Sequence, residues 1–316
     1  MQPPLDRALS ERSRLVSIAF RMLGTIAEAE DAVQETYLRW YRLSDAERAE
    51  ISNAQAWLTR AVSRVCLTQL ASARSRREQY VGPWLPEPVP AGSFAPMRSP
   101  ESASGHSRDA AALSTASAAS DPLESVVADE SISSALLLML ESMTPAERVA
   151  FVLHDVFALA FTEVAEVVDR SPAACRQLAA SARRRVAAGR RRQAPRTQHA
   201  ATIRAFEAAA RSGDIAGLVA VLDPDVELRS DGGGVISAAR RPVLGADRVS
   251  RFLLGALSQA PDATIDLVET GDGLGFAVRL DGQVSSVATF DVHEGRVTAV
   301  RMMRNPAKLT QWLRSA

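Results

Sequence analysis

This chain of 316 residues has only two cysteines, one lysine and a 5% share of aromatic residues, and its formal net charge is zero. Cys66 and Cys175 are too few for a disulfide framework or a four-cysteine metal site. Both lie in apolar, helix-like settings, so we expect reduced, buried thiols. The longest apolar run, at residues 135–140, is far short of the ~20 residues that span a bilayer. The N-terminal segment also lacks the apolar stretch of a signal peptide. We therefore expect a soluble, cytoplasmic protein without a membrane segment, metal or cofactor.

The zero net charge hides an uneven distribution along the chain. Residues 81–130 are acidic on balance, whereas the segments on either side are mildly basic. Positive charge gathers further in two arginine clusters, at residues 74–77 and 183–192. A uniformly basic nucleic-acid binder is excluded, but two separate nucleic-acid contacts are not.

Length and periodicity predict a multidomain protein with two all-α domains followed by an α+β domain. Residues 8–80 show helical spacing of apolar residues, interrupted by a polar connection at 45–53. Residues 81–125 are rich in proline, serine and alanine, which predicts an extended, solvent-exposed linker. Helical periodicity returns over 126–193. From 199 to 316, two helices (201–211 and 215–222) precede strand-like runs separated by Gly and Asp, with one more helix at 248–257.

Residues 161–189 have the pattern of a helix, a tight turn and a second helix. Asp169 and Arg170 form the turn, Ser171 is placed to cap the second helix, and Pro172 occupies its first position. The outward face of the second helix offers groups that can contact base edges and phosphates: Ser171, Ala173, Arg176, Gln177, Ser181, Arg183 and Arg184. The pattern predicts a DNA-binding helix-turn-helix. An ordinary helical hairpin with a solvated arginine face fits it too.

Three runs in order resemble the extracytoplasmic-function family of RNA polymerase sigma factors. LVSIAFRMLGTIAEAEDAVQETYLRWYR and AWLTRAVSRVCLTQLASARSRRE resemble sigma region 2, and MTPAERVAFVLHDVFALAFTEVAEVVDRSPAACRQLAASARRRV resembles region 4. YVGPWLPEPV, together with a C-terminal domain that contains DGGG and NPAKL, resembles the SigJ-like group, which carries a SnoaL-like domain behind region 4. The resemblance spans nearly the whole chain except residues 91–120.

The resemblance implies roles for both helical domains. A polar stripe of Asp31, Gln34, Glu35 and Arg39 would dock on the clamp helices of the polymerase β′ subunit, although a solvated helix face is an alternative. The second run would bind and open the promoter minus-10 element through basic residues that follow the DNA strand: Arg60, Arg64, Arg74, Arg76 and Arg77. We expect Trp57 to lie in the core rather than to stack on a base. The helix from Pro172 would bind the minus-35 element.

This chain departs from the family pattern at several positions. Thr68, Gln69 and Ala71 stand where charged residues are common, which implies fewer phosphate contacts at the minus-10 element. In the C-terminal domain, Val235 replaces a usual basic residue and Ala307 a frequent acidic one.

The C-terminal domain is expected to be a SnoaL-like cone around a pocket. Asp231, His199 and His293 are the candidates for a general base; we expect His293 to be exposed and His199 to lie in the interdomain segment. A fold alone does not establish catalysis, and we expect regulation in cis. The candidate contacts are the WLPEP segment (Trp84, Leu85, Pro86, Glu87, Pro88), the glycine turn (Asp231, Gly232, Gly233, Gly234) and the terminal motif (Asn305, Pro306, Lys308, Leu309).

The sequence thus predicts a sigma factor that binds the β and β′ subunits of polymerase core and promoter DNA, with no catalytic residues. Whether the C-terminal pocket takes a small-molecule effector stays open. Two alternatives remain: a stand-alone helix-turn-helix regulator, and a SnoaL-like enzyme with a DNA-binding appendage. The first requires promoter recognition without polymerase core. The second requires a deep apolar pocket with an inward carboxylate of raised pKa.

Overall fold

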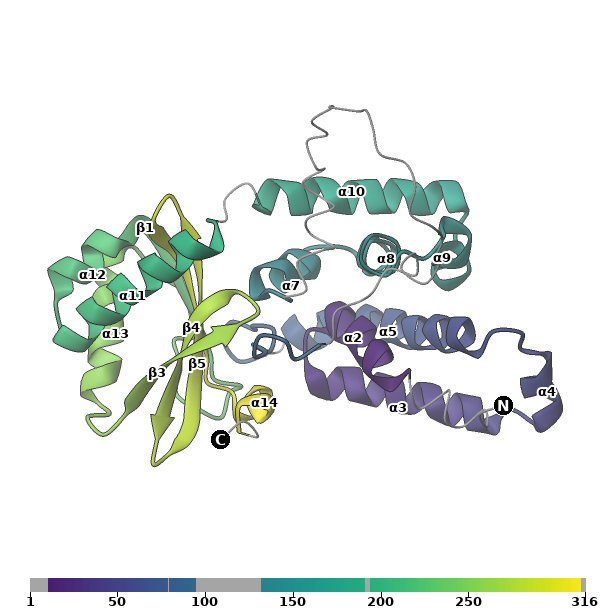
Figure 1. The fold of residues 1–316 in the computed structure, drawn as a ribbon, viewed down its shortest axis with the longest axis horizontal. Coiled ribbons are helices and arrows are strands. Elements are labelled where there is room, and N and C mark those ends of the chain that lie inside the picture. Colours follow the sequence, from purple (N-terminus) through teal and green to yellow (C-terminus); the bar gives the residue numbers. More distant parts are fainter. Residues whose placement is uncertain (1–10, 79, 95–131, 191–193, 314–316) are drawn as a thin grey trace, which may run out of the picture.

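The computed structural model describes residues 11–78, 80–94, 132–190 and 194–313, without the side chains of 73–78 and 189–190. A helical half and an α+β half lie side by side, with the linker residues between them (Figure 1). The predicted class, two all-α domains followed by an α+β domain, is confirmed.

The first helical domain consists of α2 (Arg12–Leu23), α3 (Ile26–Arg42), α4 (Asp45–Glu50) and α5 (Ala54–Glu78). Helix α2 ends at Gly24, whose left-handed backbone (φ 87°) turns the chain into α3, and Thr25 caps α3 through the Glu28 N–H. The polar connection predicted at 45–53 contains a short helix, α4, that the sequence pattern did not predict. Ser44 and Glu47 form a capping box, which makes a helix of this polar stretch.

The second helical domain consists of α7 (Ser134–Glu141), α8 (Pro145–Phe151), the π-helix η2 (Val152–Val156), α9 (Phe161–Val168) and α10 (Pro172–Arg190). Asp169 adopts the left-handed conformation (φ 55°) that ends α9, and the Ser171 hydroxyl accepts a hydrogen bond from the Ala174 N–H. The helix, turn, helix geometry predicted from the sequence is therefore present.

The two helical domains share a single hydrophobic core. Leu15, Ile18 and Leu58 from the first domain belong to the same buried cluster as Val149 and Leu153 from the second. Arg148, 3% exposed, donates to the Met22 carbonyl oxygen at 2.7 Å and so joins α8 to α2. The predicted burial of Cys66 and Cys175 is confirmed, and burial raises the pKa of both thiols.

The C-terminal domain packs three helices against one face of a curved mixed sheet, so it is α+β as predicted (Figure 1). The helices are α11 (Arg196–Ser212), α12 (Ile215–Val221) and α13 (Ala246–Ser258). The strand order is β2-β1-β6-β5-β4-β3, with only β1 and β6 parallel. The strands are β1 (Leu222–Asp231), β2 (Val243–Leu244), β3 (Thr264–Thr270), β4 (Gly273–Leu280), β5 (Gln283–His293) and β6 (Arg296–Met303). A 3₁₀ turn, η3 (Pro306–Lys308), and α14 (Thr310–Leu313) follow.

The linker is not solvent-exposed where it carries the WLPEP segment. Residues 85–89 are buried between the α2–α3 turn and the sheet domain, so the prediction of an exposed linker is wrong for them. The extended backbone is as predicted. The remainder of the expected linker, 95–125, and the expected start of the next domain, 126–131, lie outside the described residues.

Candidate functional site

Asp231, at the carboxyl end of β1, lies at the centre of a buried polar cluster. Its carboxylate accepts hydrogen bonds from the Tyr80 hydroxyl at 2.6 Å, the Leu85 N–H at 3.0 Å and the Lys308 ammonium at 2.8 Å. Asp231 is 1% exposed. A buried carboxylate is costly unless it is paired and hydrogen-bonded. These three contacts therefore stabilise the Asp231 carboxylate in its buried position. We call the cluster of Tyr80, Leu85, Asp231, Asn305 and Lys308 the clasp.

Lys308 joins the two sides of the clasp. Its ammonium also donates to the Leu85 carbonyl oxygen at 2.6 Å and lies 4.3 Å from the centroid of the Trp84 ring. Asn305 caps the η3 turn that carries Lys308, and its amide donates to the Tyr80 hydroxyl at 3.0 Å. The only lysine of the chain therefore holds linker backbone, an aromatic face and a carboxylate together.

Beyond the clasp, the linker is hydrogen-bonded to the sheet domain on one side. The Trp312 indole donates to the Pro88 carbonyl oxygen at 2.8 Å, and the Leu85 side chain packs with Leu309 and Trp312. Backbone hydrogen bonds join Val89 and Ala91 to the end of β3. The linker thus extends the edge of the sheet.

On its other side the linker is bonded to the first helical domain through Glu87. The Glu87 N–H donates to the Gly24 carbonyl oxygen at 2.9 Å, and the Glu87 carboxylate accepts the Ile26 N–H at 2.8 Å. That N–H belongs to the first turn of α3, where a negative charge is favoured. Burial nevertheless raises the pKa of the Glu87 carboxyl to about 7, against the opposing effects of the Ile26 hydrogen bond and the Lys308 charge.

The three glycines after Asp231 are required by close approach. A Cβ on Gly232 would lie 2.2 Å from the Ile236 carbonyl oxygen, and one on Gly233 would lie 2.5 Å from the Asn305 side chain. Gly234 has a left-handed backbone (φ 74°) and adjoins Val81. Val235, the departure from the family pattern, is 78% exposed.

The structure thus brings the three predicted regulatory segments together. Trp84, Leu85, Glu87, Pro88, Asp231, Gly233, Asn305, Lys308 and Leu309 take part in these contacts, and Pro86 is buried beside Gly24. Pro306 is exposed. Two residues that make these contacts, Tyr80 in the clasp and Trp312 beyond it, are absent from the predicted set. Tyr80 is the first residue of the YVGPWLPEPV run. An aromatic residue at the start of that run was the sequence signal that could have identified it.

A second contact joins the sheet domain to the second helical domain. The partly buried Asp272, in the β3–β4 turn, accepts the Ala135 N–H at 3.3 Å in the first turn of α7. Burial raises the pKa of Asp272, and the nearby Arg301 charge opposes that rise. Nothing in the sequence pattern distinguished Asp272 from an ordinary hairpin aspartate.

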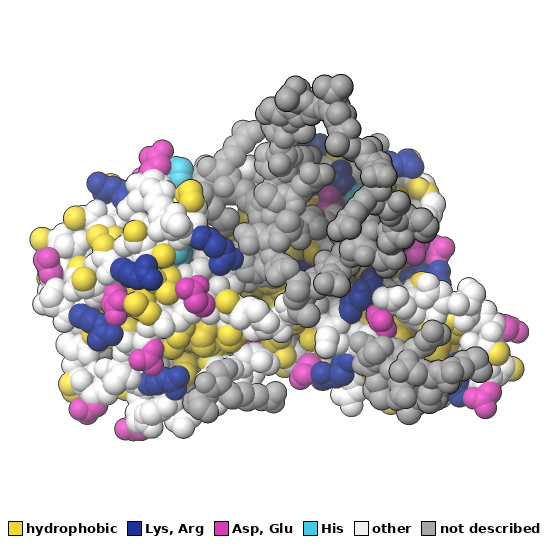
Figure 2. Space-filling model, in the orientation of Figure 1, with side chains coloured by type: hydrophobic (Ala, Val, Ile, Leu, Met, Phe, Trp, Pro, Cys, Tyr) yellow, Lys and Arg dark blue, Asp and Glu magenta, His cyan; other side chains and the backbone are white. Residues whose placement is uncertain are grey.

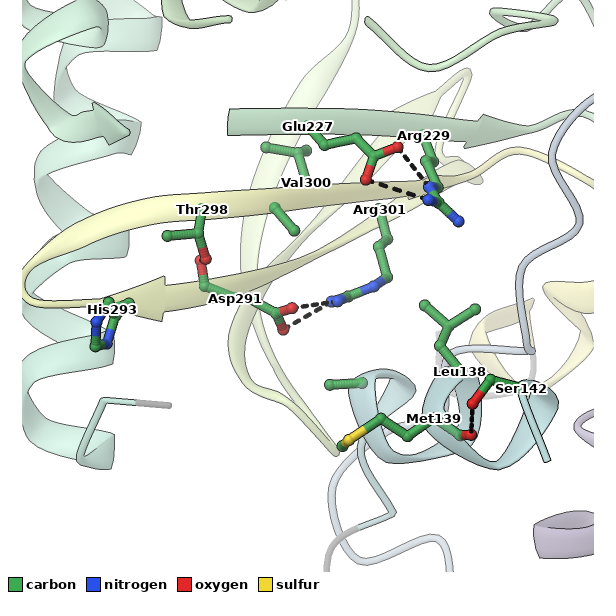
Figure 3. A pocket seen from close by; sticks show the side chains of 12 residues that line it. Leu138, Met139, Ser142, Glu227, Arg229, Asp291, His293, Thr298, Val300 and Arg301 are labelled. Atoms are coloured by element: carbon green, nitrogen blue, oxygen red, sulfur yellow. Dashed lines mark hydrogen bonds and ion pairs between the residues drawn. The ribbon is translucent and has the colours of Figure 1, made fainter. Parts of the chain in front are cut away.

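A groove of about 690 Å³ lies beside this contact, between α7 and the outer face of the sheet. Figure 3 shows Leu138 and Met139 of α7 opposite two arginine–carboxylate pairs on the strands, Glu227–Arg229 and Asp291–Arg301. The arginines are neutralised by their own strand neighbours. The sheet face toward α7 is thus polar but balanced in charge.

Two of the predicted minus-10 residues contact region 4. The Arg60 guanidinium pairs with the Glu166 carboxylate of α9 at 2.5 Å, and Arg64 donates to the Glu166 carbonyl oxygen at 2.7 Å. Glu166 was not singled out in the sequence. Arg74, Arg76 and Arg77 are in the last turns of α5, and their side chains lie outside the described residues. Trp57 is half-buried against Trp40, with ring centroids 5.2 Å apart.

The predicted minus-35 residues divide into two sets on α10. Ser171, Ala173, Arg176, Gln177 and Arg184 are exposed at the helix surface. Ser181 instead donates to Glu147 at 2.8 Å, and Arg183 pairs with Asp155 of η2. The last two side chains therefore join helices within region 4. Arg176 lies 5.8 Å from the centroid of the Phe161 ring, which restrains its guanidinium at the surface.

The predicted polymerase-contact residues follow one stripe of α3. Asp31, Gln34 and Arg39 are exposed, and Glu35, which is half-buried, pairs with Arg39 at 2.5 Å. Leu38 and Tyr41 are 51% and 44% exposed on the same helix. Their spacing from Gln34 places them on that stripe.

An apolar cavity of about 290 Å³ lies between the helices and the sheet of the C-terminal domain, lined by Phe206, Phe252, Phe276 and Phe290 among others. None of the three general-base candidates lines it. Asp231 belongs to the clasp, and His293 is partly exposed. His199 is not in an interdomain segment as predicted: it is buried in α11 with Nε2 3.1 Å from the Phe290 carbonyl oxygen. Glu207, which lines the cavity, pairs with Arg211 at 2.8 Å.

Among the described residues, no cluster of histidine, cysteine and carboxylate side chains is arranged to hold a metal ion. No helix in the described ranges is both long and apolar enough to cross a bilayer.

Comparisons with known proteins agree with this architecture. The family model of sigma-70 region 2 matches residues 9–76, and that of sigma-70 region 4 matches residues 133–186. The chain is 38% identical to the extracytoplasmic-function (ECF) RNA polymerase sigma factor SigJ of Mycobacterium tuberculosis over 95% of this chain and 91% of that protein. It is 33% identical to the probable ECF sigma factor SigI of the same species, over 95% and 92% of the two chains.

The solved structures include a similar fold over the whole chain. The crystal structure of M. tuberculosis SigJ superposes with a TM-score of 0.68 at 35% identity, and the match covers 97% of this chain and 98% of that one. Both sigma regions and the fused third domain are thus matched in one protein. The chain belongs to the extracytoplasmic-function family of RNA polymerase sigma factors, which direct transcription initiation.

Proposed function

We propose that the surfaces of the helical half bind the partners of initiation separately. The α3 stripe of Asp31, Gln34, Glu35 and Arg39 docks on the polymerase β′ clamp helices, with Leu38 and Tyr41 adding apolar area. The arginines of α5 follow the minus-10 strand, and the exposed start of α10 enters the major groove at minus-35 while region 4 contacts the β subunit. The chain acts in the cytoplasm, where polymerase core transcribes.

We infer further that the C-terminal domain regulates this activity in cis. The observation that carries the proposal is the buried clasp, in which Asp231 accepts the Leu85 N–H of the linker at 3.0 Å and Lys308 donates to the Leu85 carbonyl oxygen at 2.6 Å. The same linker is bonded to the α2–α3 turn through Glu87, and Asp272 contacts α7. All three domains are therefore fixed in one arrangement.

In that arrangement two of the five minus-10 arginines are engaged within the chain. Arg60 and Arg64 are bonded to Glu166 of region 4, and a common core joins the two sigma regions. Promoter binding at two distant elements requires the regions to separate. Because the clasp is intramolecular, it acts at a high effective concentration and disfavours that separation.

The test is transcription in vitro with purified polymerase core at limiting concentration. Tyr80→Phe removes one hydrogen bond from Asp231, so we expect a higher transcript yield than with the unaltered chain. Ser258→Ala, which removes an exposed hydroxyl at the end of α13, is the control. Chains shortened before Asn305 and at residue 199 complete the series. If Tyr80→Phe and both shortened chains give the same transcript yield as the unaltered chain, regulation in cis is rejected.

The same assay separates the sigma factor from a stand-alone regulator. We expect the isolated protein to bind duplex promoter DNA weakly and polymerase core tightly, because each DNA-binding face is modest alone. Tight, sequence-specific duplex binding without polymerase core contradicts this assignment.

We also propose that the apolar cavity takes an uncharged, apolar effector and performs no catalysis. Four phenylalanines line it, whereas Asp231 is committed to the clasp. The probe is an environment-sensitive naphthalene dye. Ala256→Trp fills the cavity and should abolish the dye fluorescence, whereas Leu244→Trp, on an exposed edge strand, should not. Equal dye binding by both variants rejects the site.

A further inference from the structure

A polar pocket adjoins the clasp and is separate from the groove beside α7 and from the apolar cavity. It has a volume of about 270 Å³ and lies between linker residues Val81 and Gly82, the end of β1 and the loop of residues 232–240. Except for Arg240, its lining consists of small or uncharged residues and backbone. The volume corresponds to about nine waters at ~30 Å³ each, so the pocket has room for a small solute.

Ser230, one of the residues that line this pocket, has a buried, unpaired hydroxyl. The residue is 1% exposed, and its hydroxyl has no hydrogen-bond partner among the described residues. A buried hydroxyl without a partner is unfavourable, and such groups are usually satisfied by a ligand or an ordered water. Ser230 also precedes Asp231 directly, so a solute bonded to it would lie next to the clasp.

Arg240 gives the pocket its charge. It is exposed at the lip, and within the described part of the chain no carboxylate forms an ion pair with it. Arg304, a second cation, donates to the carbonyl oxygen of Ser237, another lining residue. The nearest carboxylate, Asp231, is already bonded to Tyr80 and Lys308. A hydroxyl donor and an uncompensated guanidinium favour a negatively charged oxygen ligand.

We propose that this pocket binds a compact oxyanion, such as inorganic phosphate or the phosphate or carboxylate group of a small metabolite, between Ser230 and Arg240. The pocket exists only while the linker is in place. A Cβ on Gly234 would lie 3.3 Å from that of Val81, and one on Gly82 would lie 3.8 Å from the Arg240 Cα. Linker residues 81 and 82 therefore form one wall, and an occupant favours the closed clasp.

The test is calorimetric titration of the full-length protein with sodium phosphate and, separately, sodium acetate, at constant ionic strength. Choline chloride serves as the cationic control. We expect saturable binding of an anion, weakened at least fivefold by Arg240→Gln and by Ser230→Ala. Arg241→Gln alters the neighbouring exposed arginine, which does not line the pocket, and should leave the affinity unchanged.

The two anions distinguish the sources: phosphate alone indicates a phosphorylated solute, and acetate alone a carboxylate. Absence of saturation, or equal weakening by Arg241→Gln and Arg240→Gln, overturns the proposal. The melting temperature without ligand shows whether the Ser230→Ala chain folds. Because the titration does not measure transcription, a failure to bind anions does not contradict regulation in cis. Likewise, a failure of regulation in cis does not contradict anion binding.

Discussion

Lys308 and Asp231 form the least exposed ion pair of the described ranges, with 7% and 0% of the side chains exposed. Such a pair contributes less to stability than its distance suggests, since both ions lose their hydration. Removing one partner is nevertheless costly, because the other remains buried and charged. Replacing Lys308 alone therefore measures how much this ion pair matters to the free energy of unfolding.

We expect Lys308→Met to lower the free energy of unfolding by about 3–5 kcal/mol, because the Asp231 carboxylate loses its ion partner. Chemical denaturation of the full-length protein measures the loss. Asp231→Asn in addition to Lys308→Met should recover part of it. Arg251→Gln, which removes an exposed pair with Asp247, should leave the midpoint unchanged. A single-variant loss no larger than that of Arg251→Gln contradicts the burial argument.

Glu87 makes stability depend on pH in a predictable direction. Its folded pKa of about 7 exceeds the usual 4.5, so the folded chain holds a proton that the unfolded chain has released. Stability from this group is therefore full below about pH 4.5 and is lost as pH rises through 7. The loss amounts to about 3 kcal/mol.

Glu87→Gln should remove that dependence. The difference in free energy of unfolding between the unaltered chain and the variant, measured from pH 5 to 8, isolates this one carboxyl from others such as Asp272. A difference that stays constant across the range means that Glu87 is ionised throughout.

At the scale of elements, the α2–α3 turn and the linker depend on one glycine. Gly24 has a left-handed backbone, and a Cβ there would lie 2.8 Å from the Trp84 ring. Gly213 ends α11 in the same conformation, with no heavy atom within 4 Å of such a Cβ. Comparing alanine variants of Gly24 and Gly213 therefore separates the effect of backbone strain from the effect of displacing the linker.

Both Gly24→Ala and Gly213→Ala should lose about 1–2 kcal/mol from the left-handed backbone. Only Gly24→Ala should also change tryptophan fluorescence and raise the rate of proteolysis between residues 80 and 94, because Trp84 must move. Identical fluorescence and proteolysis in the two variants indicate that Trp84 does not hold the linker.

The sequence predicted elements better than it predicted their exposure. Amphipathic periodicity and the Ser171–Pro172 cap located the helix-turn-helix, because these signals are local. The proline-rich WLPEP segment was expected in solvent, since its composition resembles a linker. Its burial depends on partners more than 100 residues away, at Asp231 and Trp312, which no local pattern encodes.

For the whole molecule, the shared core and the Arg60–Glu166 contact predict an opening upon binding of polymerase core. Cys66 and Cys175 are fully buried, so new cysteines at Ser52 and Ala188 can carry fluorophores selectively. We expect the distance between the labels, measured by energy transfer, to increase when polymerase core is added. Labels at Ser142 and Ala188, both within region 4, provide the control. An unchanged distance between positions 52 and 188 contradicts the opening.

The sequence by itself determined the order of domains and most helices of both sigma regions, because these follow from periodicity and caps within short stretches. The segments proposed to regulate followed from the family resemblance. Only the tertiary structure decided which of those side chains are available. It joined Asp231, Lys308 and the linker, tied Arg60, Arg64 and Arg183 to carboxylates or carbonyls of other helices, and left the apolar cavity without a candidate base. Desolvation and pairing depend on neighbours distant in sequence, so local sequence patterns do not specify them.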